Sequence, residues 1–205
     1  MQDSKARAHF RFLESDPYSI LIAFSGLRQA LVTTGYNERV NECQAAAEKL
    51  LQATGRGEQP ALLGNVTRDD YVAHQNLLRG ALARRARHYF SESERVELGA
   101  TAWREGDLRK FGQLMTESGR SSIENYECGS PPLIDLYAIL VETEGVLGAR
   151  FSGAGFRGCC VAFVEEEEGE EVAAKVGREY GGRYPRLCKD APVFLCNSDD
   201  GARIL

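Results

Sequence analysis

The stretch Gly148 to Val164, which reads GARFSGAGFRGCCVAFV, decides the fold of this chain. Short apolar runs stand at both ends, and three glycines lie within six residues between them: Gly153, Gly155 and Gly158. Glycine adopts positive φ angles at little steric cost, and tight turns require such angles. The stretch therefore predicts a strand from Gly148 to Phe151, a turn from Ser152 to Gly158 and a second strand from Cys159 to Val164.

The same glycine-rich turn could instead present backbone amide groups to a phosphate. It is not a P-loop, because the sequence contains no G-x-x-x-x-G-K-[ST] motif. From spacing alone, a tight hairpin and an anion-binding loop both stay open.

Further helical and extended patterns follow the hairpin. The acidic run Glu165 to Glu168 leads into a helix that reaches about Tyr180, because carboxylates are favourable near a helix N-terminus. Strands are predicted from Pro192 to Cys196 and from Ala202 to Leu205. With the hairpin, these elements predict an α+β sandwich that contains an antiparallel sheet.

Before the hairpin, the sequence predicts one strand and then a helical region. The apolar run Ser19 to Ser25 is typical of a buried strand. A helix is predicted from Tyr36 to Thr54, with Asn37 or Thr34 as its N-cap and Gly55 after its end. The predicted inner face of this helix consists of Val40, Cys43, Ala47, Leu50, Leu51 and Thr54.

The stretch from Arg68 to about Glu105 repeats apolar residues every three or four positions and predicts a long helix. It carries a basic cluster of Arg84, Arg85 and Arg87. Such a cluster is more often a solvated helix face than a binding patch, so we expect these arginines to face the solvent.

Two shorter helices fill the segment before the hairpin. Gly106-Asp107 breaks the helical pattern, and Leu108 to Gly119 then predicts a short amphipathic helix. Residues 120–130 are polar and rich in turn-forming types. Pro131 opens another helix that reaches about Thr143, because proline fits the first helical turn.

The composition indicates a soluble globular protein. Of the 205 residues, 43% are hydrophobic and 27% are charged, which excludes wholesale disorder and a collagen-like chain. The formal net charge of -5 argues against a general nucleic-acid binder, which needs a cationic face. No apolar run approaches the roughly 20 residues of a membrane span, and the N-terminus lacks an apolar signal core. We expect a cytoplasmic protein without nucleic-acid or membrane partners.

The six cysteines and three histidines do not predict a metal site. The sequence contains no C-x-x-C pair, and no two histidines stand four residues apart. The adjacent Cys159 and Cys160 would point to opposite faces of a strand. Reduced and mostly buried thiols are therefore expected.

Several motifs resemble one family in the same order. The stretch Gly148 to Cys160 resembles the third signature motif of the GHMP sugar kinases, specifically the galactokinase branch, whose usual form is G-x-R-M-T-G-G-G-F-G-G-C. Tyr36 to Ala47 (YNERVNECQAAA) is similar to the Tyr, Arg and Cys helix of galactokinases. Leu108 to Glu127, with LRKFGQLM and Asn125-Tyr126-Glu127, is similar to their F-G-x-L-M…S-H-x-S-L…D-Y-E stretch. The resemblance extends over residues 18–205.

The departures from these motifs resemble the plant galacturonokinase group, which phosphorylates the anomeric hydroxyl of D-galacturonate with ATP. Ala154 and Arg157 replace two glycines of the third motif, GRSSIEN at 119–125 replaces a histidine-bearing version, and GSPPLI at 129–134 replaces C-P-E-L-D. Galacturonate carries a carboxylate at C6, and a guanidinium pairs with a carboxylate bidentately. Arg157 is therefore a candidate substrate-binding residue, and a surface arginine on a hairpin turn is an equally good interpretation.

The resemblance also implies what this chain lacks. The family's phosphate loop (P-x-G-L-S-S-S-A type), its catalytic Asp and its G-E-H-x-D-Y segment lie in an N-terminal domain, and none of them occurs here. We therefore expect the C-terminal portion of a kinase that has no catalytic residue of its own and is inactive alone. The strand Ser19 to Ser25 is expected to pair with a sheet of the missing domain.

Three parts are expected along the chain. Residues 1–17 are a poorly determined N-terminal segment, and 18–105 hold a strand and long helices that link to the missing domain. Residues 106–205 are expected to be a GHMP kinase C-terminal domain with a ferredoxin-like α+β sandwich. The sequence does not predict an oligomeric state.

For the residues present, the resemblance implies two roles. Tyr36 matches the tyrosine that contacts the sugar in galactokinases, and the alternative is an aromatic ring packed at a helix start. Gly153, Gly155 and Gly158 match the motif that abuts the nucleotide loop. ATP and Mg2+ are the cofactors expected of the full-length enzyme, which would bind them and the sugar through the missing domain. The alternative function is a non-catalytic regulator or partner-binding protein derived from a sugar kinase.

Overall fold

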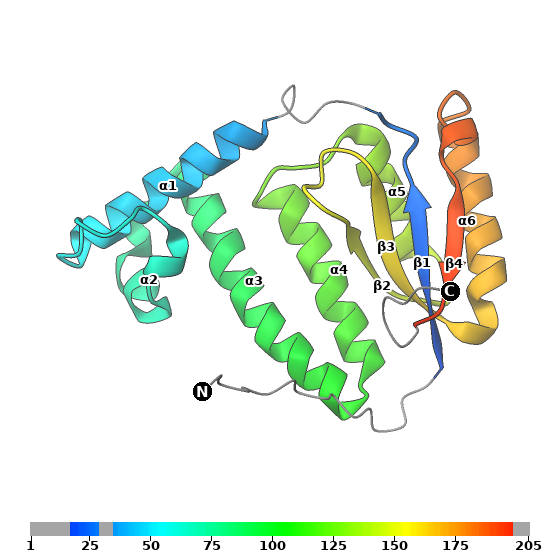
Figure 1. Ribbon diagram of the computed structural model, residues 1–205, viewed down its shortest axis with the longest axis horizontal. Coiled ribbons are helices and arrows are strands. Elements are labelled where there is room, and N and C mark those ends of the chain that lie inside the picture. Colours follow the sequence, from blue (N-terminus) through cyan, green and yellow to red (C-terminus); the bar gives the residue numbers. More distant parts are fainter. Residues whose placement is uncertain (1–16, 29–34, 199–205) are drawn as a thin grey trace, which may run out of the picture.

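The computed structural model of this protein describes residues 17–28 and 35–198 (Figure 1). In chain order, the helices and strands are β1 (Tyr18–Phe24), α1 (Tyr36–Ala53), α2 (Arg68–His74), α3 (Gly80–Glu105), α4 (Leu108–Glu124), α5 (Pro131–Glu142), β2 (Val146–Phe151), β3 (Cys159–Glu165), α6 (Gly169–Arg183) and β4 (Val193–Cys196). Short 3-10 turns add η2 (Leu63–Asn65), η3 (Gln75–Leu77), η4 (Glu166–Glu168) and η5 (Cys188–Asp190). The strand expected from Ala202 to Leu205 lies outside the described residues.

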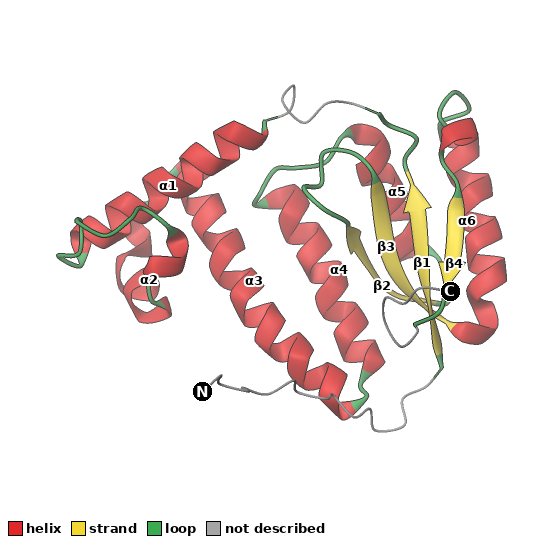
Figure 2. Cartoon of the chain, viewed as in Figure 1, coloured by secondary structure: helices red, strands yellow, loops and turns green. Residues whose placement is uncertain are grey.

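The strands form one four-stranded sheet in the order β2-β3-β1-β4, and all neighbouring pairs are antiparallel. The chain order β1-α5-β2-β3-α6-β4, with α1 to α4 inserted after β1, is the ferredoxin-like βαββαβ arrangement. Helices α5 and α6 cover one face of the sheet (Figure 2). The predicted α+β class and the ferredoxin-like sandwich are therefore confirmed.

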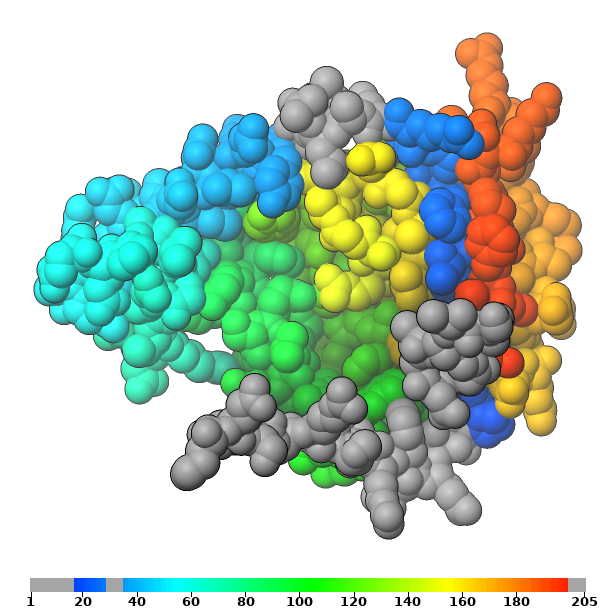
Figure 3. Space-filling view, in the orientation of Figure 1, coloured from blue at the N-terminus to red at the C-terminus, as the bar shows by residue number. Residues whose placement is uncertain are grey.

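The expected pairing of β1 with a sheet of a missing domain is wrong. β1 lies inside the sheet, because it pairs with β3 over its whole length and with β4 from Ile20 to Ala23. Figure 3 shows its surface between the β2–β3 hairpin and β4. The division of the chain after residue 105 stays a prediction, and β1 pairs with strands on the far side of that division.

The side chains of β1 alternate between a covered and an open face of the sheet. Leu21 and Ala23 are fully buried in the core that the sheet shares with α5 and α6. Ile20 and Ile22 point to the other face and are partly exposed, and Phe24 is exposed there. Near the start of β1, rings from β1, β3, α3 and α4 cluster over this second face: Tyr18, Phe163, Trp103 and Phe111.

Helices α1, α2 and α3 form a second lobe beside the sheet, with a hydrophobic core of its own (Figure 1). The buried residues of this core are Ala46, Ala47, Leu50, Leu51, Leu63, Val66, Leu78, Ala86 and Phe90. Most of the predicted inner face of α1 is therefore confirmed, but Val40 is exposed.

Two helix boundaries in this lobe differ from the expected ones. The N-cap of α1 is Gly35, with no side-chain hydrogen bond, so the cap expected at Asn37 is wrong, and Thr34 lies outside the described residues. The helix expected over 68–105 is two helices, α2 and α3. The 3-10 turn η3 and an extended backbone at Arg79 (φ -136°, ψ 155°) separate them.

Helix α4 is longer than expected and ends at Glu124 rather than near Gly119. Gly119 lies inside the helix, where a Cβ would be 2.4 Å from the ring of Tyr137 in α5. Gly112 lies against β2 in the same way, because a Cβ there would be 2.2 Å from the carbonyl oxygen of Leu147. The two glycines therefore let α4 approach the backbone of β2 and the ring of Tyr137 more closely than any other residue would allow.

Other expected boundaries are confirmed. Gly106 adopts a left-handed backbone at the end of α3, and Asp107 caps α4 by accepting a hydrogen bond from the amide of Lys110. All six cysteines are unpaired thiols, as expected, but the expectation that most of them are buried is wrong: only Cys128 and Cys160 are buried, and Cys188 is exposed. Within the described ranges, no helix is long and apolar enough to cross a membrane.

Candidate functional site

Three segments that are distant in sequence meet where the helical lobe adjoins the sheet, at the top of the view in Figure 1. They are the first turns of α1, the linker of residues 125–130 between α4 and α5, and the turn of residues 152–158 between β2 and β3 (Figure 1). Arg39 in α1 donates from Nη2 to the carbonyl oxygen of Glu127 at 3.2 Å. Gly155 of the turn lies directly against Cys128. The linker therefore connects α1 to the glycine turn.

Tyr36 is the first residue of α1, and 43% of its surface is exposed. Burial raises the pKa of the phenol of Tyr126 in the linker, and Cys43, Tyr36 and Cys128 add to this effect. The exposure of Tyr36 argues against a purely core-packing role for its ring. Its contact with a sugar stays a prediction.

The turn of residues 152–158 closes a hairpin between β2 and β3, as its glycines predict. Gly153, Gly155 and Gly158 have φ angles of 72°, 74° and 94°. The carbonyl oxygen of Gly158 accepts hydrogen bonds from the amide and the hydroxyl of Ser25, both at 2.8 Å, which fasten the turn to the end of β1. A Cβ on Gly155 would lie 2.7 Å from the sulfur of Cys128, whereas Gly153 faces open space. That this turn packs against a nucleotide-binding loop stays a prediction.

We expect Gly155→Ala to destabilise the folded chain by about 2–5 kcal/mol and Gly153→Ala by only about 1–2 kcal/mol. Both positions carry the cost of a left-handed backbone, but only Gly155 adds a clash with Cys128. Urea unfolding followed by circular dichroism measures both free energies of unfolding. Equal losses for the two variants would contradict the packing of the turn on the linker.

Arg157 lies on the other side of the turn and is exposed. It lines an open pocket of about 480 Å³ between the turn, the end of β1 and the segment before β4. Arg28 and Lys189 line the same pocket beside one carboxylate, Asp190, which pairs with Arg28 at 2.9 Å. The pocket therefore has an excess of positive charge. Tyr36 is not among its lining residues, so this pocket does not bring Tyr36 and Arg157 together.

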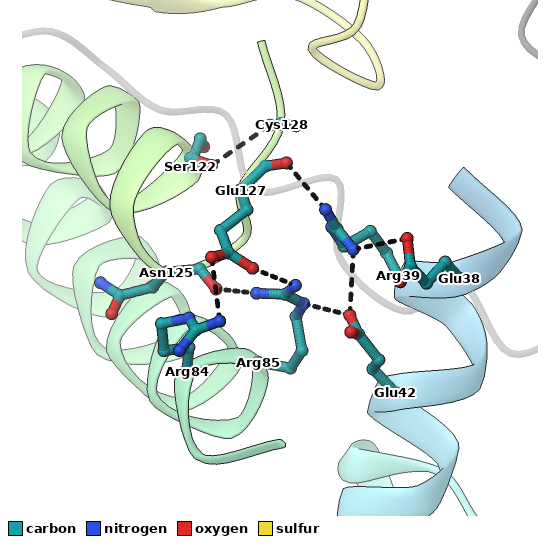
Figure 4. Close-up of polar contacts among 9 residues, drawn as sticks. All are labelled: Glu38, Arg39, Glu42, Arg84, Arg85, Ser122, Asn125, Glu127 and Cys128. Carbon is teal, nitrogen blue, oxygen red and sulfur yellow. Dashed lines mark hydrogen bonds and ion pairs between the residues drawn. The ribbon is translucent and has the colours of Figure 1, made fainter. Parts of the chain in front are cut away.

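The expectation that the basic cluster of α3 faces the solvent is wrong for Arg85, although Arg87 is exposed. Arg85 is fully buried. Its Nε donates to Oε2 of Glu42 in α1 at 2.7 Å, and its Nη1 donates to the carbonyl oxygen of Asn125 at 2.6 Å. Its Nη2 donates to Oε2 of Glu127 at 2.5 Å (Figure 4). One side chain thus joins α3 to α1 and to the linker.

Arg39 closes these contacts into a ring of four residues, Arg39, Glu42, Arg85 and Glu127, which we call the Arg85 ring. Arg39 donates from Nη1 to Glu42 and from Nη2 to the carbonyl oxygen of Glu127, both at 3.2 Å (Figure 4). Arg84 pairs with the second carboxylate oxygen of Glu127 at 2.9 Å. The hydrogen bond from Arg85 is the main cause that lowers the pKa of Glu127. Glu127 is therefore ionised at neutral pH.

A second, half-buried polar network continues along α3 toward α4. Nδ1 of His88 lies 3.0 Å from the hydroxyl of Ser121, and the ring of His88 lies 4.9 Å from that of Tyr126. The hydroxyl of Ser118 donates to Glu92 at 2.6 Å. Burial lowers the pKa of His88. Burial alone would raise the pKa of Glu92, but hydrogen bonds, first that from Ser118, outweigh it and lower this pKa.

Sequence reasoning missed both networks, although one signal is present. Arg85, His88 and Glu92 follow one another at intervals of three and four, which places them on one face of α3. Apolar residues at the same spacing predict the helix, and this polar series marks a second face of it that meets α1, α4 and the linker. Within residues 17–28 and 35–198, no group of three or more His, Cys, Asp or Glu residues could hold a metal ion.

Residues 99–182 match the family model described as GHMP kinases C terminal. The match runs from the end of α3 through α4, α5 and the glycine hairpin to α6, so it contains the turn and the linker. Residues 99–182 form a GHMP kinase C-terminal domain. The ferredoxin-like sheet of this domain is completed by β1 and β4, which lie outside the matched residues.

Several sugar kinases match this chain over nearly its whole length. A galacturonokinase from Arabidopsis thaliana is 54% identical over 194 residues, which are 92% of this chain and 46% of that protein. A galactokinase from Enterococcus faecalis is 38% identical over 189 residues, 92% of this chain and 47% of that protein. The crystal structure of Lactococcus lactis galactokinase complexed with galactose matches with a TM-score of 0.76 and 31% identity, over 89% of this chain and 45% of that chain. This chain spans a little under half the length of these relatives.

Proposed function

We propose that this chain is the C-terminal part of an ATP-dependent sugar kinase that phosphorylates D-galacturonate at its anomeric hydroxyl. The observation that carries the proposal is the 54% identity to the Arabidopsis galacturonokinase, against 38% to the Enterococcus galactokinase over a similar length. ATP, bound with Mg2+, supplies the phosphoryl group. Such a transfer depends mainly on positioning and on charge stabilisation.

Two parts of the described structure fit roles in this reaction. The outer side of the glycine turn is open at Gly153, where a side chain would meet no atom within 4 Å, so a phosphate-binding loop from the rest of the enzyme can pack there. Tyr36 offers an exposed phenol that can donate or accept a hydrogen bond with a sugar hydroxyl. In this proposal the chain supports the nucleotide loop and contacts the sugar, and the rest of the enzyme holds ATP and Mg2+.

We propose that Arg157 binds the C6 carboxylate of galacturonate. Among the residues that the structure describes, Arg157 forms no ion pair, and it lines a pocket with an excess of positive charge. A guanidinium pairs bidentately with a carboxylate, and this pairing is stronger than a hydrogen bond to a neutral hydroxyl. Galactose has a hydroxyl at C6 and would gain little from Arg157.

The test uses a chimera in which this chain replaces the matching part of the Arabidopsis galacturonokinase. Arg157→Gly is expected to lower kcat/KM for galacturonate by about 10- to 150-fold, because it removes a charge-assisted hydrogen bond of about 1.5–3 kcal/mol. The value for galactose should change little, and Arg157→Lys, which keeps the charge, should lose less. Equal losses for both sugars would reject the carboxylate role, and a chimera that prefers galactose would reject the proposed substrate.

A further inference from the structure

Burying the charged side chain of Arg85 costs free energy, because the guanidinium loses its hydration and must be paired with acceptors inside the protein. Apolar residues of similar size often stabilise a protein as well or better. Here three nitrogens of one planar guanidinium reach three acceptors on two separate segments, α1 and the linker. Such a rigid fork fixes distance and orientation, which apolar packing does less sharply. The ring is thus suited to setting a position rather than to adding stability.

The backbone of Glu127 supports the same interpretation. Glu127 has a φ of 54° and is the one non-glycine residue with positive φ in the described ranges. A strained backbone of this kind persists where surrounding contacts hold it, and such residues gather at functional sites. Arg39 holds the carbonyl group of Glu127, and Arg84 and Arg85 hold its carboxylate. The conformation of the linker is therefore imposed by arginines from two helices.

The ring reaches both parts of the candidate site. Arg39 follows Tyr36 by one helical turn, so fixing Arg39 fixes the start of α1. Cys128, the residue after Glu127, forms the surface on which Gly155 of the glycine turn rests. The contacts therefore run without a break from the turn, through the linker and the ring, to the first turn of α1.

We propose that Arg85 is a positioning residue, which sets the place of Tyr36 relative to the glycine turn by holding Glu42 of α1 and Glu127 of the linker in one ring. This inference rests on the proposed sugar contact of Tyr36. Arg85 itself is fully buried and touches no substrate. Its effect on the sugar passes through Arg39 and the start of α1.

The first part of the test uses the 205-residue chain and needs no activity. Arg85→Lys keeps the charge but loses the fork, and it should speed hydrogen exchange at the amides of Arg39 and Cys128, which bond to Gly35 and Ser122. Amides in α5 and α6 should keep their rates. The matched control is Arg87→Lys, two residues away on the exposed side of α3. Unchanged exchange at Arg39 and Cys128 would overturn the proposal, and if Arg85→Lys does not fold, Glu127→Gln serves in its place.

The second part uses the chimera and separates positioning from stability. Arg85→Lys should raise the KM for galacturonate by about tenfold and leave the KM for ATP unchanged, whereas a loss of folded enzyme would lower the apparent kcat alone. In a Tyr36→Ala background the effect of Arg85→Lys should vanish, because Arg85 acts through Tyr36. An effect that persists in that background, or an unchanged sugar KM for Arg85→Lys, would overturn the proposal while the sugar contact of Tyr36 stands. A Tyr36→Ala variant with an unchanged sugar KM would instead reject that contact, and the positioning role with it.

Discussion

Gly148→Ala is expected to destabilise the folded chain by about 3 kcal/mol or more, a large part of the stability of a domain of this size. A Cβ at Gly148 in β2 would lie 1.9 Å from the carbonyl oxygen of Gly112 in α4. The three nearest atoms all belong to the backbone of Gly112, so no flexible side chain can rotate away from the clash. Either α4 must move off the sheet or β2 must bend.

Urea unfolding of Gly148→Ala beside the unchanged chain measures this loss. The matched control is Gly177→Ala in α6, where a Cβ would meet no atom within 4 Å. Alanine is the better helix former, so this control should be more stable than the unchanged chain by about 0.5–1 kcal/mol. A Gly148→Ala chain that unfolds at the same urea concentration as the unchanged chain would show that α4 and β2 are not in backbone contact.

The glycine contacts also explain why the fold was partly predictable. The hairpin around Gly155 and the end of α3 at Gly106 follow from local chemistry, because positive φ angles strongly favour glycine. Helix α4 was predicted too short, because Gly119 and the polar residues after it are typical of a helix end. In the structure Gly119 is needed for the approach of Tyr137, so a tertiary contact overrides the local preference.

The pairing of the strands could not be predicted from the local sequence pattern. The apolar run of β1 identifies a strand, but its partners are β3 and β4, more than a hundred residues later in the chain. The motif resemblance placed the run before the helical region, in the part expected to join another domain. Only the register with both neighbours shows that β1 is an inner strand of this sheet.

The candidate site divides in the same way. Tyr36, Arg157 and the glycines of the turn are predicted from motifs, since each stands in a recognisable local context. Arg85 was misread, because its acceptors Glu42 and Glu127 are 43 and 42 residues away. A buried arginine and an exposed one have the same sequence pattern. Burial depends on whether distant carboxylates fold onto the same spot.

The purified 205-residue chain is expected to be inactive as a sugar kinase. Its rate of sugar 1-phosphate formation from ATP and galacturonate should be at least about a thousandfold below that of the chimera. Phosphoryl transfer needs amide or cationic donors around the phosphates, a group that places the metal, and a group that orients the attacking hydroxyl. At the candidate site the described residues offer a glycine turn and the exposed phenol of Tyr36, and no acidic cluster among the described residues could hold a metal ion. Each missing part alone costs orders of magnitude in rate.

Product is measured directly, by phosphorus NMR or mass spectrometry of the sugar phosphate, so that ATP hydrolysis is not mistaken for transfer. Circular dichroism of the same sample establishes that an inactive chain is folded, and the chimera supplies the positive control. Turnover by the chain that Tyr36→Ala reduces would contradict the expectation, because a contaminating kinase would not respond to that substitution. The phosphate site would then have to be built from residues of this chain, and the cationic pocket of Arg28, Arg157 and Lys189 would be the place to look for it.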